Sequence, residues 1–413
     1  MGSVTGIVVV VIGILVSVAL HEVGHMLPAK KFGVLVPDYA VGFGPALWKK
    51  KIGDTTYALR AVLLGGYVKI VGMYAPARPG TPLVGRRGKP TLAQEAREAS
   101  AEEIPPGQEA RAFYLLSAPK KIAVMLGGPL MNLLICFVLS AITMMGIGAP
   151  TASRTIASVP ATIQTSSGEI ASPAYEAGVL PGDTVTAWNG TPVATFADLQ
   201  KAVGATPEGE SAILTVERDG ASVDLTVSPV TGAQGARYVG VTAGYEYVSA
   251  SLTDVLEADS QMFTGTAAVV VRLPQAVWQV GRSVVTDEQR DATGVVSVVG
   301  VGRMAGEVTG DSASLGLRDT RQVVGVLLSL LASLNMALFV FNLIPLPPLD
   351  GGHIVGAIYE GVRRQFARLR GKEDPGPADT ARLVPLTWAV GGLLVAMSVI
   401  LIVADIVKPI SLG

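Results

Sequence analysis

The sequence has little charge and a single cysteine, and each of these two shortages excludes a class of protein or site. Only 16% of its 413 residues are charged and 49% are hydrophobic, whereas a soluble domain carries about 25% charged residues. The formal net charge of −1 gives no overall bias toward nucleic acid. One cysteine, Cys136, permits no intramolecular disulfide and no thiolate metal site, which needs several sulfurs. The composition therefore indicates a membrane protein that binds no nucleic acid.

Four uncharged stretches are each long enough to cross about 30 Å of hydrocarbon, which takes roughly 20 helical residues. The first stretch lacks the basic start and the small-residue cleavage site of a signal peptide, so we expect it to be retained. The sequence predicts a polytopic α-helical membrane protein with four transmembrane helices. These lie at 4–20, 122–145, 322–349 and 383–404, with the fourth helix extending to 407.

Lysines and arginines are unevenly distributed between the loops, and this predicts the orientation of the spans. The loop 28–121 holds fifteen Lys/Arg against seven Asp/Glu, and the loop 350–382 holds six Lys/Arg. The segment 150–321 holds ten Lys/Arg against nineteen Asp/Glu. We therefore expect the two basic loops to be cytoplasmic, and the acidic segment and both termini to be extracytoplasmic.

The segments between the spans differ in pattern. Residues 38–72 alternate and are rich in glycine and aromatics, which predicts membrane-associated β-strands with turns at Gly53-Asp54 and Gly65-Gly66. Residues 75–110 are rich in Pro, Ala, Glu and Arg and are expected to form a mobile loop. Residues 246–321 predict an extracytoplasmic or interfacial helical segment.

Residues 150–245 predict a small extracytoplasmic α/β domain. Asn189-Gly190 and Asp219-Gly220 are strong signals for two-residue hairpin turns, and Thr195 with Asp198 predicts a capping box. The string "SPAYEAGVLPGDTVTAWNGTPVATFADLQKAV" at 172–203 resembles a bacterial PDZ domain of envelope proteases. That resemblance implies a groove that receives a peptide by strand addition.

The motif "HEVGH", from His21 to His25, is the sharpest chemical signal in the chain. Positions i and i+4 share one face of a helix, so both imidazoles can reach one zinc ion. Glu22 lies beside them and can act as the general base. Two histidines and a glutamate at the end of an apolar span are costly unless they are paired or bound to metal.

A hydrolytic zinc site needs a third protein ligand, and Asp350 is the best candidate. It lies in "FNLIPLPPLDGGH", where three prolines at 345–348 prevent a regular helix. Irregular backbone at membrane depth is tolerated only where it is buried in protein or lines a watery cavity. Asp405 is a weaker candidate because it lies at the far end of the fourth span. His353 is interpreted as an outer-shell or interfacial histidine.

Three motifs in this order resemble the site-2 protease family of intramembrane metalloproteases: "HEVGH", "GGPLMN" at 127–132 and "NLIPLPPLDGGH" at 342–353. The PDZ-like insert resembles the bacterial envelope-stress branch of that family. The resemblance implies a zinc metalloendopeptidase that binds one Zn²⁺ through His21, His25 and Asp350, with Glu22 as the base.

The family resemblance also implies that Asn342 helps to hold the substrate or the transition state. Asn132, buried in the second span, is either a substrate contact or an inter-helix hydrogen bond. Strands 57–60 and 66–70 resemble the membrane-associated hairpin of the family, so Gly66 and Tyr67 are candidates to pair with an unwound substrate.

The implied substrate is a single-pass transmembrane protein such as an anti-sigma factor, cut after a first extracytoplasmic cleavage; remnant signal peptides are a second class. Membrane lipid and a peptide ligand of the PDZ-like domain are further expected partners. Two other functions stay open. One is a non-proteolytic membrane scaffold that presents the PDZ-like domain. The other is a metal transporter, although transporters usually carry internal repeats, and none is found here.

Overall fold

A computed structural model describes residues 2–85, 88–165, 168–232, 235–286, 290, 294–312, 315, 317 and 319–410. The chain divides into two compact units. The first comprises Met1–Thr143 and Ser251–Gly413, and the second comprises Met144–Ala250. Each unit is described by itself.

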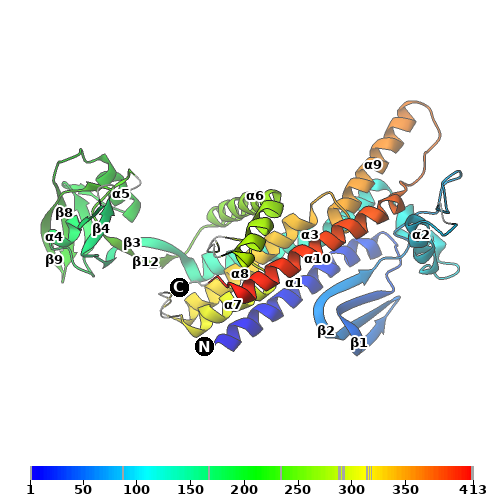
Figure 1. Ribbon diagram of the computed structural model, residues 1–413, viewed down its shortest axis with the longest axis horizontal. Coiled ribbons are helices and arrows are strands. Elements are labelled where there is room, and N and C mark those ends of the chain that lie inside the picture. The colour runs from blue at the N-terminus through cyan, green and yellow to red at the C-terminus, as the bar shows by residue number, and fades with distance from the viewer. Residues whose placement is uncertain are drawn as a thin grey trace. The chain divides into compact units, whose positions relative to one another are not determined.

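The first unit contains four helices that are long and apolar enough to cross a membrane, judged by length and composition. In Figure 1 they run alongside one another, and buried apolar clusters join α1, α3 and α8. The third helix ends seven residues earlier than the sequence predicts, because the proline-rich stretch from 345 cannot continue it. The four helices are α1 (Ser3–Lys31), α3 (Ala118–Ala141), α8 (Thr320–Asn342) and α10 (Val384–Val407).

Two long strands, β1 (Asp38–Ile52) and β2 (Thr55–Lys69), form the β-region after α1. The predicted turn at 53–54 joins them, with Gly53 at φ +58°. The turn predicted at 65–66 is wrong, since β2 continues through it and Gly65 adopts φ +87° instead. Residues 38–41 pair with 56–59 and with 66–69, whereas 66–69 have no other pairing among the described residues. The stretch 66–69 is therefore an edge.

The segment 75–110, expected to be a mobile loop, contains the helix α2 (Leu92–Glu102). Arg97, with a side chain only 3% exposed, donates to both carboxylate oxygens of Asp379 at 2.7 and 2.9 Å. Two short turns follow, η1 (Glu109–Arg111) and η2 (Phe113–Leu115). The ion pair joins the helix α2 to the residues that precede α10, so residues 92–102 are not a loop.

Three more helices complete the first unit. The interfacial segment forms α6 (Leu252–Val285), which opens with a capping box, and α7 (Val298–Gly310). The stretch 350–382 is not only a loop, because α9 (Asp350–Leu369) occupies its first half. Glu360 of α9 is buried and pairs with Lys121 of α3 at 2.7 Å. This pair fixes α9, and with it Asp350, against α3.

The second unit is built on a sheet with the strand order β12-β3-β6-β8-β9, with β7 paired to β6. Its apolar core lies between this sheet and α5 (Phe196–Ala205) and includes the buried Trp188. The predicted turns at 189–190 and 219–220 are present, with Asn189 and Asp219 at positive φ. The predicted capping box at the start of α5 is also present.

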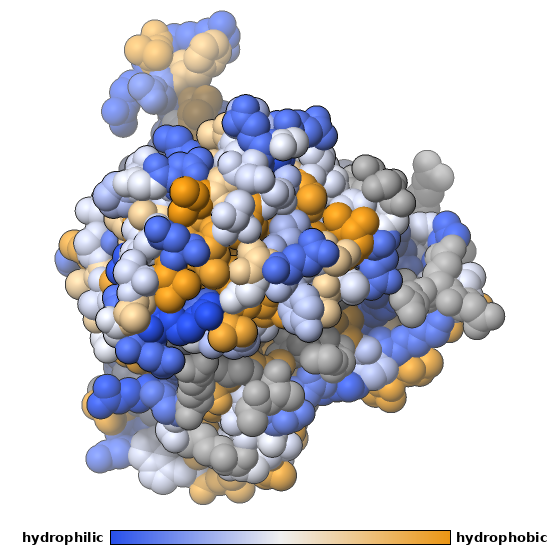
Figure 2. All heavy atoms as spheres, turned by 90° about the vertical axis from the view of Figure 1, so that its left-hand side faces the viewer, coloured by the Kyte–Doolittle hydropathy of each residue, from blue (hydrophilic) through white to orange (hydrophobic). Residues whose placement is uncertain are grey.

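The strand and helix bounds of this unit follow from short runs of alternating residues. Figure 2 shows a face of the molecule on which hydrophilic, neutral and hydrophobic residues are mixed. The remaining elements are β3 (Ala149–Ser158), β4 (Thr162–Thr165), β5 (Gly168–Ala171), α4 (Pro173–Glu176), β6 (Thr184–Trp188), β7 (Thr191–Pro192), β8 (Ala212–Arg218), β9 (Ala221–Val227), β10 (Val230–Thr231), β11 (Arg237–Tyr238) and β12 (Thr242–Val248).

Candidate metal centre and active site

The helix α1 presents both histidines of the "HEVGH" motif on one face. One helical turn separates His21 from His25, so the two rings lie one above the other. Their Nε2 atoms are 3.2 Å apart, and the rings meet edge to face. His25 is buried.

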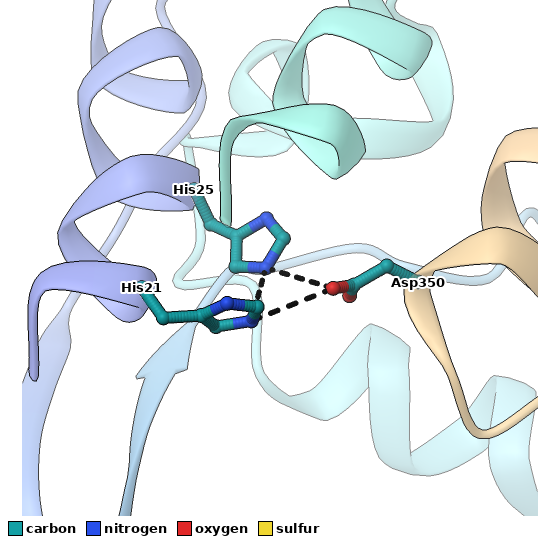
Figure 3. A group of neighbouring side chains, drawn as sticks. All are labelled: His21, His25 and Asp350. Atoms are coloured by element: carbon teal, nitrogen blue, oxygen red, sulfur yellow. Dashed lines mark hydrogen bonds and ion pairs between the residues drawn. The ribbon is translucent and has the colours of Figure 1, made fainter. Parts of the chain in front are cut away.

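Asp350 reaches the same point from the far end of the chain. α8 ends at Asn342, the chain turns through the prolines, and α9 begins with Asp350. The turn is tight: a Cβ at position 351 would lie 2.2 Å from the Ile344 carbonyl oxygen. Figure 3 shows the Asp350 carboxylate pointing at the two rings, with Oδ2 3.5 Å from His21 Nε2 and 3.3 Å from His25 Nε2.

This donor set fits a zinc ion. One ligand atom from each of the three residues lies within 4.8 Å of the others. Oδ2 of Asp350 is buried and receives no hydrogen bond that meets ordinary geometry from the described residues. Two imidazole nitrogens and one carboxylate oxygen form a common ligand set for hydrolytic zinc, which leaves a fourth position for water or substrate.

The charge state of Asp350 suits a ligand. Burial by itself disfavours the carboxylate form, but the close contacts of Asp350 with the His21 and His25 rings outweigh it. The pKa of Asp350 therefore lies below its ordinary value, and the group is ionised at neutral pH.

One face of α3 lies behind the two histidines. His25 Nδ1 is 2.8 Å from the carbonyl oxygen of Val124, and His21 Nδ1 is 2.9 Å from Oδ1 of Asn132. A Cβ at Gly128 would lie only 2.2 Å from His25 Nε2 and 2.7 Å from His21 Nε2. The sequence singled out "GGPLMN" only as a family motif, and the place of Gly128 against the rings was not predicted.

The same motif allows α1 and α3 to cross closely. A Cβ at Gly24 would lie 2.2 Å from the carbonyl oxygen of Gly127, and a Cβ at Gly127 would lie 1.9 Å from that of Gly24. Small residues at such a crossing let two membrane helices approach backbone to backbone. This approach brings the face of α3 within reach of the histidine rings.

A cavity of about 710 Å³ opens over the candidate ligands. Glu22, Asn342 and Tyr67, three of the predicted residues, contribute to its wall, as does His353. Burial lowers the pKa of His353, which favours its neutral form. Gly66 is close by, since a Cβ there would lie 3.6 Å from Cγ of Glu22. The edge stretch 66–69 thus borders the cavity.

Asp405, the rival acid, belongs to a different cluster. Its carboxylate pairs with Arg290 and accepts hydrogen bonds from the backbone amides of Ser297 at 2.6 Å and Gly300 at 3.2 Å. These contacts join α10 to the start of α7. Asp405 is therefore bound by residues outside the candidate metal site.

Comparison with known proteins identifies the family. The profile of Peptidase family M50 matches residues 9–374. This chain belongs to peptidase family M50. The M50 proteases are the site-2 protease family, and Zn²⁺ is the metal that the candidate ligands would hold. The chain is therefore a zinc metalloendopeptidase with a multi-pass membrane fold.

The named relatives of this M50 protease are also metalloproteases. It is 33% identical to "Zinc metalloprotease Rip1" of Mycobacterium tuberculosis, with 99% of each chain covered. It is 30% identical to Rip1 of Mycolicibacterium smegmatis over 98% of each chain. It is 26% identical to "Metalloprotease MmpA" of Caulobacter vibrioides over 86% of each chain.

Proposed function

We propose that this protein cleaves the transmembrane segments of single-pass substrates in regulated intramembrane proteolysis, after a first extracytoplasmic cut. One observation carries the proposal. Two imidazoles from an apolar helix and a carboxylate more than 300 residues away converge within 4.8 Å, beside Glu22, in a single cavity. A membrane scaffold has no need of this arrangement.

Each residue of the site has a role in the proposed reaction. His21, His25 and Asp350 would hold the zinc ion, which would activate water for attack and polarise the scissile carbonyl. Glu22 accepts the proton of the attacking water and delivers it to the leaving amine. Asn342 lines the cavity, and its amide nitrogen donates to the carbonyl of Leu338 at 3.0 Å. Its amide oxygen is the group proposed to face the substrate.

The substrate must unwind locally, because helical carbonyls are hydrogen-bonded within the helix. Each backbone group left unsatisfied in lipid costs several kcal/mol. The edge at 66–69 borders the cavity and pairs on one side only among the described residues. We propose that it pairs with the unwound segment at Gly66 and Tyr67.

The second unit is proposed to be a PDZ-like domain that restricts access to substrates whose outer domain has been trimmed. A groove of about 740 Å³ runs between α5 and residues 237–241 and supports this proposal. Its wall includes Phe196 and Leu199, which suits an apolar side chain of an added strand. Anti-sigma factors and remnant signal peptides are the proposed substrate classes.

The proposed orientation places the basic loops and the open side of the site toward the cytoplasm, and both termini outside. The charge asymmetry between loops supports it, with fifteen Lys/Arg in 28–121 against ten in the longer segment 150–321.

Replacement of Glu22 tests the proposed reaction. Glu22→Gln keeps the shape of the side chain but removes the base, so cleavage of a model transmembrane substrate should fall by at least 100-fold. Zinc should remain at one ion per chain and leave only slowly on chelation. Asp350→Ala should lose both zinc and cleavage. Unchanged cleavage by Glu22→Gln would contradict Glu22 as the base. A native chain that cleaves no transmembrane substrate would support the scaffold, and rapid exchange of zinc would support the transporter.

A further inference from the structure

The face of α3 behind the histidines contains residues spaced by one helical turn. Val124, Gly128 and Asn132 are four positions apart, so they share one face of the helix. The backbone carbonyl of Val124 and the side chain of Asn132 accept hydrogen bonds from the two rings. Gly128, between them, has no side chain to obstruct the Nε2 atoms. The His25 partner is a backbone carbonyl, but the His21 partner is a side chain and can be changed.

The hydrogen bond to Asn132 fixes the chemical state of His21. A histidine that offers Nε2 to a metal must carry its proton on Nδ1, and that N–H needs an acceptor. The Asn132 amide must then turn its oxygen toward the ring, since the opposite orientation would set two donors against each other. Oδ1 of Asn132 lies 2.9 Å from Nδ1, as this requires.

The side chain of Asn132 makes no other hydrogen bond to the described residues. It is fully buried, and its amide nitrogen has no partner there. Asn335, the buried asparagine of α8, has the opposite arrangement: its amide nitrogen donates to Oγ of Ser17 and to the carbonyl of Leu331, and its amide oxygen has no partner among the described residues. A buried unsatisfied donor costs about 1–3 kcal/mol. Each of these two asparagines therefore carries one unpaired group, but only the side chain of Asn132 is bonded to a candidate zinc ligand.

We infer that Asn132 is a positioning residue of the metal centre, not a substrate contact. It holds the Nδ1–H form of His21 and the orientation of the ring, and so raises the affinity of the site for zinc. Loss of such an outer partner typically weakens metal binding about 10–100-fold. The inference rests on the proposed metal site.

Zinc affinity of the full-length protein in detergent tests this inference. The metal-free protein is titrated with Zn²⁺ in competition with a chromophoric chelator. Asn132→Leu should bind zinc about 10–100-fold more weakly, whereas Asn132→Asp, whose carboxylate also accepts from Nδ1–H, should bind at least as tightly as the native chain. Asn335→Leu is the matched control and should stay within about twofold of the native affinity, because Asn335 has no bond to the rings.

A second measurement separates positioning from helix packing. Asn132→Leu removes one buried unpaired donor and leaves Nδ1 of His21 without its partner. These two effects oppose each other, so the metal-free variant should unfold on heating close to the native temperature. Native zinc affinity together with a lower unfolding temperature would overturn the inference and make Asn132 a packing residue. Asn132→Ala replaces the leucine variant if leucine does not fit. Asp350→Ala is measured in parallel: native zinc affinity in that variant would overturn the metal site itself.

Discussion

At the scale of single residues, the metal site requires a glycine at position 128 as much as it requires the three ligands. Gly128 lies where both imidazoles face α3, and the nearest ring nitrogen would be 2.2 Å from a Cβ there. That separation is far shorter than a van der Waals contact, so either the rings or the helix must move.

Gly128→Ala should therefore abolish stoichiometric zinc binding and cleavage while the helices still form. The added methyl group displaces the Nε2 atoms from the positions that a metal needs, although alanine favours a helix more than glycine does. Metal analysis of the purified protein measures the loss. Gly392→Ala in α10 is the control, because a Cβ there meets nothing within 4 Å; full zinc content in both variants would contradict the prediction.

The sequence predicted the candidate ligands better than their surroundings. His21 and His25 follow from helical spacing, and Asp350 follows from a carboxylate beside prolines at membrane depth. The bond from His21 to Asn132 could not be predicted, because it depends on where α1 and α3 cross. The Gly24–Gly127 contact decides that crossing, and glycine alone does not specify its partner.

At the scale of elements, a largely buried ion pair joins α2 to the residues before α10. Arg97 and Asp379 are 3% and 11% exposed, and breaking a buried pair by removing one partner is costly. Arg382 still contacts Asp379 at 2.9 Å and compensates in part.

Arg97→Met should detach α2 from the residues before α10 at a cost of about 3 kcal/mol. Hydrogen exchange of the amides in 92–102 should then speed up, and proteases should cut within 75–110 sooner. Arg303→Met, which breaks an exposed pair within α7, should leave this segment unchanged. The double variant Arg97→Met with Asp379→Leu should recover most of the protection, since no unpaired charge is left buried. Equal exchange in native and Arg97→Met chains would contradict the assignment.

The elements that the sequence predicted well are those with strong periodicity or long apolar runs. The four apolar helices and the hairpins at 189–190 and 219–220 are of this kind. α2 and α9 were interpreted as parts of loops, because both are amphipathic and too charged to span a membrane. What stabilises them is pairing with distant charges, Arg97 with Asp379 and Lys121 with Glu360, and such pairs leave no local signal.

At the scale of the whole molecule, the second unit is inserted through a two-stranded ribbon. β3 and β12 pair along their length, and Ala149 lies opposite Val248. Directly opposed residues of an antiparallel pair are about 4.5–5.5 Å apart. A short turn can therefore replace the whole unit without stretching the chain.

Replacing 149–248 by a two-residue Gly-containing turn tests the proposed gating role. If the unit excludes substrates with a large outer domain, the shortened protein should cleave such a substrate as fast as a trimmed one. Zinc content should stay at one ion per chain, because no candidate ligand lies in the deleted range. The same deletion combined with Glu22→Gln controls for other proteases. Continued discrimination against the untrimmed substrate would count against gating by this unit.

Cys136 carries a practical consequence for the orientation of this protein. It is the chain's only thiol, and it is fully buried beside Asp259, with 3.8 Å between Sγ and Oδ1. Water-soluble maleimides should leave the native chain unlabelled in sealed vesicles. A cysteine introduced into any loop would then report by itself which compartment that loop faces, with no background to subtract.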